Sequence, residues 1–150
     1  MAPFTKQTKW AYGWHWRPSD GGLSHGDRRV PKVGQRLVAH TKRGKAVKDP
    51  KWCMAGFHAA PSLADSIGFS GYGDRLSYVM MEDCKFYGDM PKFVARARTI
   101  IWETDVPSQK FNDIKSLEKL LKKKGFNVAN AQARARRLRK KNSAKNKKVK

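Results

Sequence analysis

The sequence predicts an α+β fold, with a small, mostly antiparallel sheet and one short helix, followed by a basic helical hairpin and a flexible tail. Two patterns predict this class. Apolar residues alternate with period two in several segments of the first two thirds, which is typical of strands. After Pro107 the spacing becomes helical and Lys and Arg dominate. We therefore expect an α+β body over 1–106, a basic hairpin over 107–141 and a disordered tail over 142–150.

The N-terminal part of the body contains two expected strands and the short helix. In "KWAYGWHWRP", residues 9–18, alternation places Trp14 and Trp16 on one face and His15 on the other. "QRLVAHTK", residues 35–42, is typical of a second, shorter strand. "PSLADSIGFS", residues 61–70, predicts a helix that starts at a proline and buries Leu63 and Ile67.

The clearest strands are "RLSYVMME", residues 75–82, and "KFVARARTIIWETD", residues 92–105. In the second, alternation predicts that Arg96 and Arg98 share one face, with Lys92 in line behind them. The hairpin would begin at a cap, Asn112 or Asp113, and its first helix would end at Gly125. A second helix, about 129–141, would bury the apolar residues Ala131, Ala135 and Leu138.

The charge is large and concentrated at one end of the chain. The formal net charge is +21; residues 1–106 hold 17 basic and 10 acidic residues, whereas 107–150 hold 16 basic and 2 acidic ones. Such a field favours polyanions, and it predicts electrostatic contacts with the phosphates of DNA or RNA. The residues expected to make them are Lys122, Lys123, Lys124, Arg134, Arg136, Arg137, Arg139, Lys140, Lys141, Lys145, Lys147, Lys148, Lys92, Arg96 and Arg98.

Several other classes of protein are disfavoured. No apolar run is long enough to cross a bilayer, and the N-terminus has no secretory signal pattern, so we expect a cytoplasmic protein with no membrane partner. Cys53 and Cys84 have no metal-binding spacing with the histidines, so we expect neither a metal nor another cofactor. The five tryptophans are expected in the core, with base stacking by one or two as the alternative.

The body resembles a family of small, uncharacterised phage and prophage proteins. The resemblance lies in "AYGWHWRPSDGGLSHGDRRVPKVGQRL", "WCMAGFHAAPSLADSIGFS" and "DMPKFVARARTIIWE", roughly residues 11–103. It implies a phage accessory protein in the cytoplasm of a host cell, and it brings no activity with it. The basic C-terminal region lies outside it.

A weaker resemblance predicts an enzyme instead. "GFHAAPSLADSIGFSGYG" resembles a segment of the ADP-ribosyltransferase fold, on which RNA 2′-phosphotransferases use His and Arg. The resemblance implies His15 and His58 as catalytic candidates, Arg96 or Arg98 as a phosphate clamp, and NAD as a cofactor. A third hypothesis is a module that binds or inhibits a host or phage protein through its charge. The sequence does not predict whether the nucleic acid is DNA or RNA, nor the oligomeric state of the protein.

Overall fold

The described residues form one sheet, with a short helix between two of its strands, followed by two longer helices. The computed structural model describes residues 6–17, 29–40, 44–50, 56–68, 74–88, 91–106 and 113–149, and of 143–149 the backbone only. In chain order the elements are β1 (Lys6–Arg17), β2 (Arg36–Val38), β3 (Phe57–Ala59), α1 (Leu63–Ser66), β4 (Arg75–Tyr87), β5 (Lys92–Asp105), α2 (Ile114–Lys123) and α3 (Val128–Val149). The predicted α+β class is confirmed.

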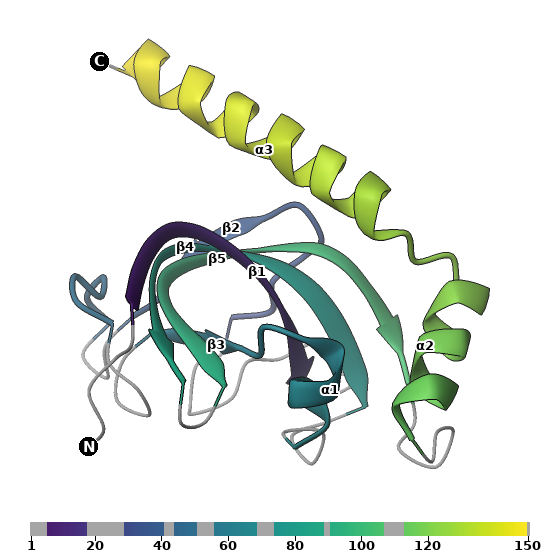
Figure 1. Cartoon of the computed structure of the whole chain (residues 1–150). Coiled ribbons are helices and arrows are strands. Elements are labelled where there is room, and N and C mark those ends of the chain that lie inside the picture. The colour runs from purple at the N-terminus through teal and green to yellow at the C-terminus, as the bar shows by residue number, and fades with distance from the viewer. Residues whose placement is uncertain are drawn as a thin grey trace.

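The sheet is antiparallel and strongly curved. Its strand order is β1-β4-β5-β2, and β3 also pairs with β5. Figure 1 shows β1, β4 and β5 arching over β3. After β3 the chain reaches β1, where Trp14 and Ala60 exchange two backbone hydrogen bonds of 2.8 Å. Gly13 permits this approach, because a Cβ there would lie 2.7 Å from the carbonyl oxygen of Ala60.

Two hydrophobic cores lie against the sheet. The first contains Trp14, Trp16, Tyr78 and Met80, and α2 and α3 contribute the buried residues Leu117, Leu121, Ala131 and Ala135 to it. The second contains residues such as Val79, Met81, Phe57 and Ala59. Trp14 and Trp16 therefore both face the first core, on the same side of the sheet, as alternation predicts. The C-terminal helices complete the first core, and Figure 1 shows α3 over the outer, convex side of the arch.

Several elements differ from those expected; β1, β2 and β4, for example, span Lys6–Arg17, Arg36–Val38 and Arg75–Tyr87. The helix at 61–70 is short: α1 ends at Ser66, although Leu63 and Ile67 do pack against the first core. β3 forms at the end of an apolar run for which no strand was expected. The predicted disorder of 142–150 does not hold for 142–149, which continue α3. These residues contain neither glycine nor proline, so nothing in the local sequence ends the helix before them.

Candidate nucleic-acid interface

α2 is capped at both ends, and its C-terminal end carries exposed lysines. The Asp113 carboxylate accepts a 2.8 Å hydrogen bond from the Ser116 backbone N–H, which begins the helix and lowers the pKa of Asp113. At the other end, Gly125 donates to Lys122 O and Phe126 to Leu121 O, both at 3.0 Å. Gly125 has φ 95° and so allows this turn. The exposed lysines there are Lys119, Lys122, Lys123 and Lys124.

Phe126 anchors the turn between the two helices. Its ring centroid lies 4.9 Å from that of Trp14, 5.2 Å from Tyr78 and 5.0 Å from Trp102. α3 starts at Val128, and the side chain of Asn127, just before it, accepts a 3.0 Å hydrogen bond from the Asn130 backbone N–H. Phe126 has no role in the expectations drawn from the sequence. An apolar residue directly after a C-terminal glycine is a signal for this packing.

The inner side of α3 is attached to the aromatic side of the sheet. Ala131 and Ala135 are buried, and the Gln132 side-chain amide donates a 3.0 Å hydrogen bond to the Tyr78 hydroxyl. The Arg139 guanidinium lies 4.1 Å from the centre of the Trp10 ring, which is a cation–π contact. Arg139 is thus half-buried between α3 and β1 and serves partly to attach the helix. The apolar residues that the sequence predicts to be buried on this helix, Ala131, Ala135 and Leu138, are the ones that pack in the first core.

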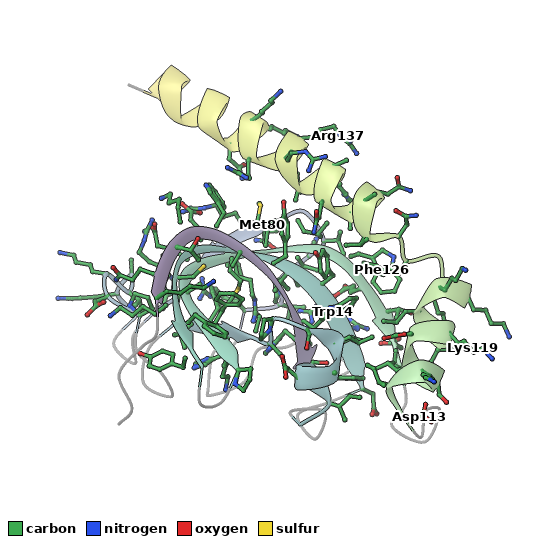
Figure 2. All side chains as sticks on the ribbon, in the orientation of Figure 1. Trp14, Met80, Asp113, Lys119, Phe126 and Arg137 are labelled. Carbon is green, nitrogen blue, oxygen red and sulfur yellow. The ribbon has the colours of Figure 1, made fainter. Side chains whose placement is uncertain are left out.

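The outer side of α3 is cationic. Its exposed side chains include Arg134, Arg136, Arg137, Lys140 and Lys141. Figure 2 shows Arg137 on α3 and Lys119 on α2 pointing away from the sheet. Within the described residues, every ion pair is formed by cations of the sheet strands, and none uses a cation of α2 or α3. These five cations of α3 and the four exposed lysines at the C-terminal end of α2 are together called the cationic helix surface below. The side chains of Lys145, Lys147 and Lys148 lie outside the described residues.

The expected row Lys92–Arg96–Arg98 is not part of that surface. Arg98 is only 5% exposed; its guanidinium lies 4.5 Å from the centre of the Phe57 ring and donates a 3.2 Å hydrogen bond to His58 O. Arg96 instead donates a 2.8 Å hydrogen bond to Asp83. Lys92 is half-buried at the start of β5. The two arginines therefore have different surroundings, and the expected shared basic face is not formed.

β4 has a backbone irregularity opposite Arg96. Asp83 has φ 54°, in the left-handed region, although the register between β4 and β5 is the same on both sides of it, from Glu82↔Ala97 to Cys84↔Ala95. Lys9 and Arg96 both donate hydrogen bonds to the Asp83 carboxylate. Burial acts to raise the pKa of Asp83, but these two bonds outweigh it and lower the pKa. Arg96 is held in this ion-pair cluster, which is consistent with a structural role.

His15 and His58 lie near each other, but strand geometry directs their side chains to different sides of the sheet. His58 alternates with Phe57 and Ala59, both in the second core, so strand geometry directs its side chain away from that core. His15 leaves β1 on the second-core side, opposite to Trp14 and Trp16. Burial, then the nearby charges of Arg98 and His58, lower the pKa of His15 well below its ordinary value. The imidazole is therefore neutral at pH 7. The two-histidine enzyme hypothesis stays a prediction.

Beside His15 lies a row of polar residues across three strands. His15 pairs with Ser77 and Ser77 with Glu103, and the Ser77 hydroxyl donates a 3.4 Å hydrogen bond to the Glu103 carboxylate. Arg17, only 1% exposed, forms an ion pair with the same carboxylate. Within the described part of the chain there is no group of three metal-ligating side chains. No helix among the described residues is long and apolar enough to cross a membrane.

Comparisons with known proteins leave the family open. A scan against protein-family models, a search of curated proteins and a search of solved structures each find no match. The phage setting that the sequence resemblance implies therefore stays a prediction. The cationic helix surface is the feature that points to a function.

Proposed function

We propose that this protein binds nucleic acid through phosphate contacts made by the cationic helix surface. One observation carries the proposal: nine exposed cations on two neighbouring helices, with no ion pair to them among the described residues. No acidic residue follows Glu118 in the sequence. A surface of one sign that the fold itself does not neutralise is the usual footprint of a polyanion-binding protein.

Electrostatic energy supports this proposal. On α3, neighbouring cations such as Arg137 and Lys141 stand one helical turn apart, where like charges destabilise a helix. Phosphates bound at this surface would relieve the repulsion and release condensed counterions. If six to nine phosphates are neutralised, affinity should fall by roughly 10³ to 10⁵ between 50 and 200 mM salt.

The packing of α3 also supports the proposal. Its inner side is held by Ala131, Ala135 and the Gln132–Tyr78 hydrogen bond, so the outer side faces solvent in a fixed orientation. Side chains held on a folded helix lose less freedom on binding than those of a disordered tail. The interface is thus largely formed before nucleic acid binds.

The test is a matched pair of charge reversals. Arg137→Glu with Lys140→Glu changes the cationic helix surface, and Lys32→Glu with Lys48→Glu makes the same change in net charge at exposed positions outside α2 and α3. We expect the first pair to weaken binding to mixed-sequence DNA and RNA at least tenfold and to reduce the salt dependence, with little effect of the second. Equal effects of the two pairs, or no binding by wild type at 50 mM salt, would contradict the proposal. A complex with an acidic protein that survives nuclease treatment would favour the protein-partner hypothesis instead.

A further inference from the structure

We propose, on the basis of the nucleic-acid function above, that the cationic helix surface selects double-stranded over single-stranded nucleic acid. Three features carry this inference: where the aromatic rings lie, how rigid the row of cations is, and how α3 is attached to the sheet.

The aromatic rings near α3 are already used by the fold. Proteins that bind single strands stack bases on free ring faces. Here Arg139 covers the Trp10 ring at 4.1 Å, and Tyr12 stacks on Tyr78 with ring centroids 5.7 Å apart and planes 4° from parallel. Trp14 and Trp102 pack against Phe126. After Phe126 the sequence contains no aromatic residue, so the cationic side of α3 offers no ring to an unpaired base.

The cations of α3 lie along one straight helix. The helix has 22 residues, and the exposed cations whose side chains are described, from Arg134 to Lys141, span about 11 Å of its axis at 1.5 Å per residue. Figure 1 shows α3 as an unbroken helix whose side away from the sheet faces no other element. A duplex is stiff over about 150 base pairs, so it can lie along such a row without loss of chain freedom. A single strand would have to be straightened, which costs conformational entropy.

Charge density adds to this preference. A duplex carries one phosphate per about 1.7 Å of its axis, about twice the density of one strand. It also releases more counterions for each cation that replaces them. The attachment of α3 through Ala135 and Gln132 keeps the cations on the outer side, so the surface cannot wrap around a flexible strand.

The test compares a labelled 20-nucleotide strand alone and annealed to its complement, as DNA and as RNA, by fluorescence anisotropy at fixed salt. For whichever of DNA and RNA binds more tightly, we expect the duplex to bind at least tenfold more tightly than the single strand. Equal or tighter binding of the single strand, weakened by Arg137→Glu with Lys140→Glu, would overturn the duplex inference and leave the proposed function intact. Failure of both to bind would remove the proposed function itself.

A second variant tests helix rigidity at constant charge. Asn142 lies three residues after Arg139, which contacts Trp10, so Asn142→Pro should kink the helix beyond that contact, whereas Asn142→Ala should preserve it. We expect the proline variant to lose at least threefold in duplex affinity with little change for the single strand. If both variants keep the wild-type preference, the preference does not depend on a continuous helix and this part of the inference is wrong.

Discussion

Removing the ring of Phe126 tests whether the C-terminal helices are part of the folded core. The ring contacts Trp14, Tyr78 and Trp102, with centroid distances of 4.9, 5.2 and 5.0 Å. The same residue closes the end of α2 through its backbone N–H, which donates to Leu121 O at 3.0 Å. In Figure 2 Phe126 lies between the sheet and the two helices. Phe126→Ala removes the ring and keeps this backbone hydrogen bond.

The expected loss follows from burial and ring contacts. Truncating a fully buried phenylalanine to alanine costs about 3–5 kcal/mol. Phe126 is half-buried, but each aromatic pair adds about 0.5–1.5 kcal/mol beyond its buried area. We therefore expect Phe126→Ala to lower the free energy of unfolding by about 2–3 kcal/mol. For a chain of this length the corresponding fall in Tm is roughly 5–10 °C.

Urea unfolding, followed by tryptophan fluorescence and by helical circular dichroism, measures this loss. Phe126→Leu is the control: it keeps an apolar side chain but loses the ring pairs, so it should cost about 1 kcal/mol. A loss below about 0.5 kcal/mol for Phe126→Ala would show that the ring cluster does not hold α2 and α3 on the sheet. The fixed orientation of the cationic helix surface would then lose its basis.

Three further predictions concern single residues. Gly125→Ala should cost about 1–2 kcal/mol in urea unfolding, because Gly125 has φ 95° with open space around a Cβ, so the cost is backbone strain; Gly125→Asn should cost less. Because the pKa of His15 is lowered by burial and by Arg98, the unfolded chain binds a proton below about pH 6.5 that the folded chain does not. Stability should therefore fall by up to about 1.4 kcal/mol per pH unit below that point, and His15→Gln should remove this slope. Burial raises the pKa of Cys84 to about 12, so in a Cys53→Ser variant the remaining thiol should react with a disulfide reagent at pH 8 only after unfolding in urea.

Each of these predictions can fail in a distinct way. Equal stability of Gly125→Ala and wild type would mean that the turn after α2 is not held in the left-handed conformation. Identical pH slopes for wild type and His15→Gln would place the proton uptake on another group. Rapid reaction of Cys84 in the folded protein would mean that this part of β4 opens readily.

Local patterns were enough to predict most of the elements. The strand at 92–105 is predicted with its observed bounds, because alternation over fourteen residues is a strong signal. The cap, expected at Asn112 or Asp113 and observed at Asp113, and the end of α2 before Gly125 also follow from single residues whose backbone preferences are specific. The separation of Trp14 from His15 depends only on period two. These features need no knowledge of distant contacts.

Distant contacts decide what the sequence could not predict. The different surroundings of Arg96 and Arg98 go with the positive φ of Asp83 on a neighbouring strand, which no pattern within β5 indicates. The attachment of α3 to the sheet depends on Tyr78 and Trp10, which are far from α3 in the sequence. The charge of the candidate interface could be read from composition, whereas its orientation required the fold.

Substituting a cation on the outer side of α3 should affect stability and nucleic-acid binding in opposite directions. Arg137 is exposed, and at three or four residues from it stand Arg134, Lys140 and Lys141, all cations. Like charges at these spacings cost about 0.2–0.5 kcal/mol each, so Arg137→Gln should raise the free energy of unfolding by about 0.5–1 kcal/mol at low salt. The same variant should weaken duplex binding, because one phosphate contact is lost. If Arg137→Gln raises the free energy of unfolding and weakens duplex binding, Arg137 serves binding and not stability. If the variant lowers both the free energy of unfolding and the affinity, Arg137 supports the fold.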